Sequence, residues 1–148
     1  MPDEIARELS LLIKEEFKEQ TSEMTAEKCF EVFVEKIVEK EGKYKIISLD
    51  FENENVFLKV SNGQKIFELN SASTGHLEAF VTALKSGGIN GFEVFDYTEA
   101  STSEGVGSQA ISFVLLRMSN GEKIWGVGLS PDIVKAPCLA VISALNRV

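Results

Sequence analysis

The sequence predicts an α+β fold in which a β-β-β-α unit occurs twice, related by pseudo-twofold symmetry and preceded by a small helical pair. The segment 56–67, Val-Phe-Leu-Lys-Val-Ser-Asn-Gly-Gln-Lys-Ile-Phe, recurs at 114–125 as Val-Leu-Leu-Arg-Met-Ser-Asn-Gly-Glu-Lys-Ile-Trp, a constant offset of 58 positions. Apolar residues follow helical spacing up to about residue 42, and strand composition begins at Tyr44. We therefore expect a helical subdomain at 1–42 and a main domain at 43–148.

The first 42 residues are expected to form two amphipathic helices. Thr25 is a candidate N-cap of the second helix, because its hydroxyl can accept an unpaired first-turn N–H. The two helices are too short to enclose a core, so their apolar faces must pack against the main domain. These faces are Ile5, Leu9, Leu12, Ile13 and Phe17 in the first helix, and Cys29, Phe30, Phe33 and Ile37 in the second.

The first unit reads as strands at 46–51, 56–60 and 65–69, followed by a helix at 76–84. Asn62-Gly63 is a strong hairpin signal between its second and third strands. In the second unit Asp132 is a candidate helix cap, and Pro137 predicts a bent first turn with regular helix at 137–146. One unit cannot bury both faces of its sheet, so the two should pack together.

Composition excludes several function classes. The net charge of −8 and the pI of about 4.8 disfavour nucleic-acid partners. No apolar run reaches the roughly 20 residues that cross a bilayer, and no signal peptide is evident, so we expect a soluble cytoplasmic protein without a membrane partner. Cys29 and Cys138 are expected to be reduced, buried thiols.

Catalysis has little support in the sequence. His76 is the single histidine, and the two cysteines lack zinc-site spacing, so no metal site is expected. The Gly-x-Gly of residues 126–128 lacks the third glycine of a dinucleotide fingerprint and is better read as a tight turn. We expect no cofactor and no enzymatic activity from this chain by itself.

Two strand-to-helix junctions, at 71–76 and 126–132, offer helix N-termini that suit a carboxylate. Apolar residues follow or precede them in sequence, with Glu78 and Asp96 as candidate partners for an ammonium group. A free branched-chain amino acid carries this combination of groups. The apolar residues are Leu77, Phe80, Val94 and Leu129.

Several further motifs carry a family resemblance. Asp96-Tyr97-Thr98-Glu99 and the following Gly/Ser-rich stretch, Trp125 to Ser130, the segment 74–84 and the terminal segment 141–147 occur in one order. In that order they resemble the leucine-binding regulatory domain of 2-isopropylmalate synthases, over essentially residues 44–148. The related citramalate synthases share this fold, and the helical pair is similar to the subdomain that links barrel to sensor.

The resemblance implies an amino-acid-sensing regulatory domain built from two β-β-β-α units. It implies a homodimer that binds leucine, or as the second choice isoleucine, at the dimer interface. The bound amino acid would inhibit a catalytic barrel of the same or another chain. The barrel itself needs about 250 residues and is not contained in this sequence. The effector contacts that it implies are Gly75, Leu77, Glu78, Val94, Tyr97, Ser101, Ser108, Ala110 and Leu129.

Departures from the family pattern leave alternatives open. The family's Gly-Asn-Gly-Pro turn is Ser-Thr-Gly-His at 73–76, and its histidine after Asp-Tyr-x-Glu is Ala100. Usual alanines are replaced at Glu78, Ser101 and Ser108. Besides leucine sensing, we therefore consider an isoleucine sensor and a dimerisation module without a ligand. An RNA-binding module is disfavoured by the acidic charge.

Overall fold

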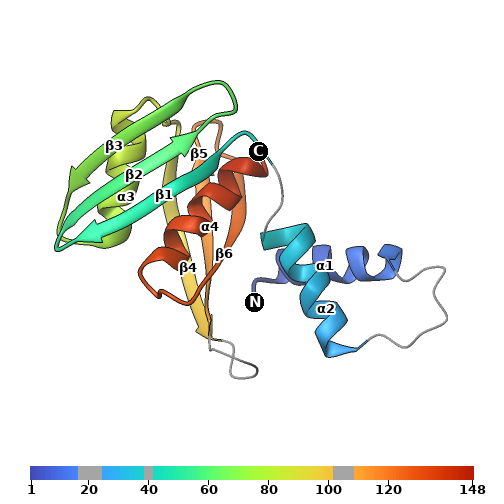
Figure 1. Ribbon diagram of the computed structural model, residues 1–148. Helices are drawn as coiled ribbons and strands as arrows, with labels where there is room; N and C mark the ends of the chain where they lie inside the picture. The colour runs from blue at the N-terminus through green and yellow to red at the C-terminus, as the bar shows by residue number, and fades with distance from the viewer. Residues whose placement is uncertain (17–24, 39–41, 102–108) are drawn as a thin grey trace.

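The computed structural model describes residues 1–16, 25–38, 42–101 and 109–148. It contains two antiparallel three-stranded sheets, each followed by a helix, and so confirms the duplicated β-β-β-α fold (Figure 1). Sheet 1 consists of β1 (Lys45–Glu52), β2 (Asn55–Ser61) and β3 (Ile66–Ala72), followed by α3 (His76–Ser86). Sheet 2 consists of β4 (Phe92–Ser101), β5 (Ala110–Met118) and β6 (Lys123–Ser130), followed by α4 (Lys135–Asn146).

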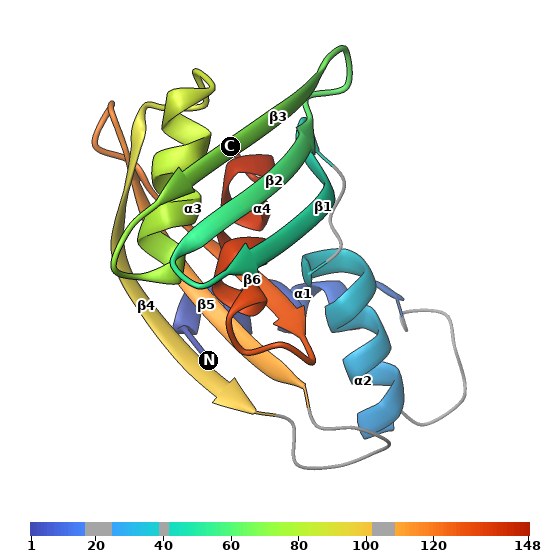
Figure 2. The same ribbon diagram turned by 60° about the vertical axis from the view of Figure 1, so that its left-hand side comes forward.

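The main core lies between the two sheets, where α3 and α4 are enclosed (Figure 2). Both helices present the same buried positions to this core. Ala79, Ala83 and Leu84 of α3 recur 61 positions later as Ala140, Ala144 and Leu145 of α4, and all six residues are buried. Neither unit covers its own sheet alone, so each supplies part of the other's apolar environment.

The two units differ in the register of their third strands. Ser61 pairs with Ile66 in sheet 1, whereas Arg117, which corresponds to Lys59, pairs with Lys123 in sheet 2. The pairing is therefore displaced by three residues between the two hairpins, although both contain Ser-Asn-Gly. Because side chains alternate between the faces of a sheet, an odd displacement moves each third-strand residue to the opposite face.

This displacement decides which side chains of β6 face α4. Gly126 and Gly128 lie beneath the helix, and a Cβ atom at these positions would lie 2.0 Å from the Ala140 carbonyl oxygen and 1.9 Å from the Ala136 carbonyl oxygen. Only glycine permits this close approach of strand and helix. Trp125, Val127 and Leu129 of β6 point to the other face of sheet 2 instead.

The helical pair covers that outer face of sheet 2. It consists of α1 (Asp3–Glu16) and α2 (Ala26–Phe33), which continues into a π-helical turn, η1 (Val34–Val38). Thr25 is confirmed as the N-cap of α2, since its Oγ1 accepts the Lys28 N–H at 3.2 Å. A second cluster joins the pair to the sheet and contains Ile5, Phe33, Ile37, Phe113 and Val127.

Two sequence-based details of the helices were wrong. Phe30 is 43% exposed rather than internal, because it lines an open cavity between the helical pair and the main domain. The last helix begins at Lys135 rather than near Pro137. Pro137 is its third residue, in the first turn, where a missing N–H costs no helical hydrogen bond. Phe17 lies outside the described residues.

Asp132 does not cap α4 directly but shapes the turn before it. Its Oδ1 accepts the Val134 N–H at 2.9 Å, and Val134 is the N-cap residue. Both cysteines are free; Cys138 is buried, as expected, and Cys29 is only half-buried. In the described part of the chain, no helix is long and apolar enough to span a bilayer.

Candidate functional site

A cavity of about 440 Å³ lies between α3 and the first part of β4. Leu77, Val81 and Val94 provide apolar walls, and its polar groups include the carboxylates of Glu78 and Glu93 and the ammonium group of Lys85. The volume falls within the range of small-molecule sites, roughly 300–1,000 Å³. Apolar walls with charges of both signs suit a small dipolar ligand that carries an aliphatic group.

The two carboxylates of this cavity differ in their partners. Arg117 donates a hydrogen bond from Nη2 to Glu93 Oε2 at 2.8 Å. This hydrogen bond and the Arg117 charge lower the pKa of Glu93, with Lys85 adding to the effect and desolvation opposing it. Glu93 is therefore already compensated. Glu78 has no ion-pair partner among the described side chains and is the freer acceptor for a ligand ammonium group.

Beyond this cavity, further predicted residues lie on the inner face of sheet 2, along β4. Val94 pairs with Leu116, and Tyr97 pairs with Val114, so both lie on the face that packs toward the main core. The β-bulge at Phe95 adds one residue to β4, so Tyr97 lies on the same face as Val94 although the two residues are three positions apart. Ala110 lies on the same face two residues before Ser112, and its register partner across β4 is Ser101.

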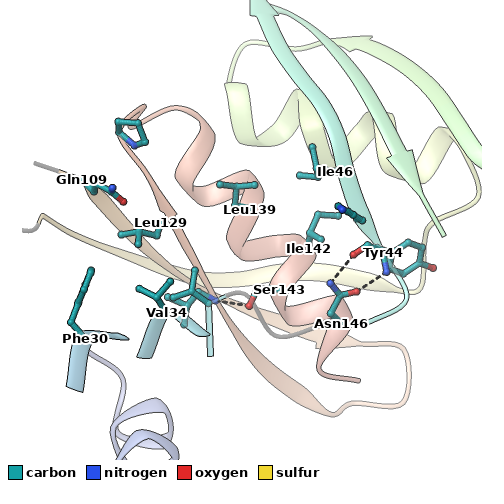
Figure 3. A pocket seen from close by; sticks show the side chains of 15 residues that line it. Phe30, Val34, Tyr44, Ile46, Gln109, Leu129, Leu139, Ile142, Ser143 and Asn146 are labelled. Carbon is teal, nitrogen blue, oxygen red and sulfur yellow. Dashed lines mark hydrogen bonds between the residues drawn. The ribbon is translucent and has the colours of Figure 1, made fainter. Parts of the chain in front are cut away.

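A larger cavity of about 1030 Å³ lies between the helical pair, β1, β6 and α4 (Figure 3). Its walls are largely apolar, with Phe30 and Val34 facing Leu129, Leu139 and Ile142. Leu129 belongs to the outer face of sheet 2, because it pairs with Ile111. The two cavities are therefore separate features of the molecule.

Two polar side chains of the larger cavity, Asn146 and Ser143, are engaged in structural contacts. Asn146 accepts the Tyr44 N–H through Oδ1 and donates from Nδ2 to the Tyr44 carbonyl, both at 2.8 Å (Figure 3). Ser143 Oγ accepts the Val127 N–H at 3.0 Å. These bonds fix the start of β1 and the middle of β6 to α4. The charged side chain of the larger cavity is that of Lys45, whereas the smaller cavity has charges of both signs and is the better candidate for recognising a dipolar ligand.

Comparison with known proteins identifies the type of domain. The family model of the LeuA allosteric (dimerisation) domain matches residues 7–148. The chain belongs to this family.

Curated relatives agree with this assignment. The chain is 38% identical to 2-isopropylmalate synthase of Helicobacter hepaticus over 81 residues, which is 55% of this chain and 14% of the relative. It is 42% identical to the synthase of Mycobacterium ulcerans over 82 residues, 54% of this chain and 14% of the relative. With the synthase of Pseudomonas entomophila, identity is 31% over 122 residues, 76% of this chain and 21% of the relative. The match thus spans about a fifth or less of each of these relatives.

The LeuA-type fold brings together part of the predicted effector set. Leu77, Glu78 and Val94 line one cavity, and Gly75 is the N-cap residue of α3, two positions before Leu77. Tyr97 and Ala110 continue along the same face of sheet 2. Leu129 lies on the opposite face.

Three further predicted positions are placed as follows. Ser101 is the last residue of β4, where it pairs with Ala110. Ser108 lies outside the described residues. Asp96 pairs with Leu115, on the face opposite Tyr97, and its Oδ1 accepts the N–H of Tyr97 at 2.8 Å. Of the two acids predicted as ammonium partners, Glu78 therefore lies at the cavity and Asp96 does not.

Sequence reasoning missed four residues that line the smaller cavity: Val81, Thr82, Lys85 and Glu93. Helical periodicity contained a signal for three of them, because residues three, four and seven or eight positions after Leu77 and Glu78 lie on one helix face. Glu93 needed the tertiary structure. Within the described residues, no group of three His, Cys, Asp or Glu side chains is placed to hold a metal ion.

Proposed function

We propose that this chain is the regulatory part of a 2-isopropylmalate synthase-like enzyme, that it binds free leucine as a feedback effector, and that it dimerises. The observation that supports effector binding most directly is the α3–β4 cavity, whose aliphatic walls and unpaired Glu78 match the groups of a free amino acid. Catalysis is assigned to a barrel outside this sequence, in the same or another chain.

Each ligand group has a chemical counterpart at the cavity. The isobutyl group would contact Leu77, Val81 and Val94, the ammonium group would pair with Glu78, and the carboxylate would approach Lys85. One methylene is worth about 0.8 kcal/mol when buried, which corresponds to roughly fourfold in affinity. Leucine should therefore bind several-fold more tightly than valine, while isoleucine differs from leucine only in shape.

Titration calorimetry with L-leucine, L-isoleucine, L-valine and D-leucine tests this proposal. We expect saturable heat with L-leucine and weaker binding of valine and of the D-enantiomer. Leu77→Ala should weaken leucine binding by at least about tenfold, since it removes a wall of the cavity. Glu78→Gln should weaken it through loss of the ammonium partner.

Leu129→Ala is the matched comparison, because it shortens a leucine that lines the other cavity. Unchanged leucine affinity in this variant would restrict the effector to the α3–β4 side. Tighter binding of isoleucine would indicate an isoleucine sensor. No heat with any of these amino acids at millimolar concentration would contradict effector binding and favour a dimerisation module without a ligand.

We further propose that binding is communicated through β5 to the helical pair. Phe113 of β5 packs against the pair, while its neighbours Ser112 and Val114 lie on the inner face next to β4. Glu8 of α1 also forms a hydrogen-bonded ion pair with Arg147 at the end of α4. Hydrogen exchange of residues 3–16 and 26–38 should slow when leucine is added. Identical protection with and without leucine would contradict this coupling.

A further inference from the structure

Among the edge strands that the structure describes, β4 has the largest number of exposed residues. We propose that it pairs in antiparallel fashion with β4 of a second copy, about a twofold axis perpendicular to sheet 2. The two three-stranded sheets would then form one continuous sheet of six strands. This inference rests on the dimerisation part of the proposed function and is independent of effector binding.

The four edge strands are not equally available. β6 lies against α4 and η1, and β1 also contacts α4, so both edges face other elements. β3 and β4 remain, and both lie at the border of the molecule (Figures 1 and 2). In β3, exposed and half-buried residues alternate, whereas in β4 every residue from 95 to 100 is exposed. The second half of β4 is therefore the larger uncovered edge.

The unpaired edge of β4 is not blocked against another strand. Single-chain proteins protect such edges with lysine, proline, bulges or covering segments. β4 contains neither lysine nor proline, and beyond its bulge at Phe95 the residues from Asp96 to Ala100 pair with β5 without a further irregularity. Among the described residues, no strand pairs with the edge of β4 opposite β5. Its outward N–H and C=O groups can therefore form a ladder with a partner strand.

Large side chains on both faces of β4 would gain cover from such a partner. Tyr97 is 53% exposed on the inner face, and Phe95 is 49% exposed beside Arg117 and Lys123, whose charged groups lie over its ring. In β3, the large exposed apolar residue is Ile66, at the first position beside the hairpin. An added strand at β4 would bury parts of both aromatic rings.

The charges of β4 exclude some registers for self-pairing. A twofold axis perpendicular to the sheet places one residue opposite itself. An axis at Asp96 would set Asp96 against its own copy and Glu93 against Glu99, which opposes like charges. An axis at Tyr97 sets Asp96 against Thr98 and Glu99 against Phe95, so no acid faces an acid. Axes at Phe95 and Thr98 also avoid opposed acids, but the first lies on the bulge and the second sets Tyr97 against Glu99. The axis at Tyr97 instead sets two exposed aromatic rings against each other, so we take the register centred on Tyr97.

Sedimentation equilibrium of the whole chain and of Tyr97→Lys tests the interface, with Phe57→Lys as the matched control. Phe57 is 47% exposed, at the centre of the uncovered face of sheet 1. A lysine at 97 would face its own copy, so we expect the dimer dissociation constant to rise at least about tenfold, with Phe57→Lys unchanged. Circular dichroism would verify that both variants are folded.

Cross-linking supplies a test that does not depend on weakening the dimer. In a Cys29→Ser background, Tyr97→Cys should be joined to its copy by a short bismaleimide, whereas Phe57→Cys should not. A dimer that persists in Tyr97→Lys, without a cross-link in Tyr97→Cys, would overturn the β4 interface and leave dimerisation intact. A wild-type monomer at about 100 µM would overturn dimerisation itself, whatever calorimetry shows for leucine.

Discussion

The third strands of the two units show how one sequence motif can serve two environments. Phe67 of β3 packs into the main core, whereas Trp125, the corresponding residue of β6, packs against the helical pair on the opposite face. Ile66 is 58% exposed, while its counterpart Ile124 packs against the main core. The reason is the three-residue displacement between the two hairpins, which exchanges the faces of the strand.

This difference gives the two sheets different partners. Sheet 1 uses one face for the core and leaves Phe57 and Ile66 of the other face in solvent. Sheet 2 is apolar on both faces: α4 approaches closely over Gly126 and Gly128, and the helical pair covers Phe113 and Val127. Of the two units of the duplication, the second thus binds the helical pair and the first does not.

The largest expected effect is a difference in the free energy of unfolding between variants on the outer faces of the two sheets. Phe113→Ala should destabilise the chain by about 3–5 kcal/mol, because a buried aromatic ring leaves a cavity under the helical pair. Phe57→Ala removes a half-exposed ring from sheet 1 and should cost less than about 1 kcal/mol. Urea denaturation of both variants measures the contrast. Equal losses would mean that the helical pair does not depend on this face.

A second prediction concerns the close approach of β6 and α4. Gly128→Ala places a methyl group against the Ala136 carbonyl and should cost about 3 kcal/mol or more, since backbone atoms on both sides must move. Asn70 occupies the corresponding position of β3 and is exposed, so Asn70→Ala should change stability by less than about 0.5 kcal/mol. Thermal unfolding of the two variants tests the register difference directly, because a common register would make their effects similar.

The smallest expected effect is a difference in thiol reactivity between matching positions of the two repeat helices, α3 and α4. Burial, with a contribution from the Asp132 charge, raises the pKa of Cys138 in α4 to about 12. At pH 8 only roughly one Cys138 in ten thousand would be ionised, so labelling should be very slow. Leu77 occupies the matching position of α3, 61 residues earlier, and borders the cavity.

In a Cys29→Ser background, Leu77→Cys should therefore label much faster than Cys138. Comparable rates at the two positions would contradict the enclosed state of α4. The raised pKa of Cys138 also makes the free energy of unfolding depend on pH. An unfolded thiol ionises above about pH 9, but the folded one does not until about pH 12, so this contribution to stability declines over that interval.

Much of the candidate site could be located from local sequence. Leu77 and Glu78 follow a strand-to-helix junction, and Val94 and Tyr97 belong to the next strand, which the topology returns alongside α3. Leu129 was grouped with them because its junction resembles the first one. The structure places it on the other face, since the register of β6 reverses the side to which odd-numbered residues point.

The sequence by itself determined the duplicated unit, the helical pair and the Thr25 cap, because repeats, periodicity and capping chemistry are encoded by neighbours along the chain. The tertiary structure decided the register of β6, the side of sheet 2 that receives the helical pair, and the contribution of Lys85 and Glu93 to the cavity. These features depend on which surfaces fit together in space. A hairpin with the same Ser-Asn-Gly residues can close in either register until α4 requires glycine beneath it.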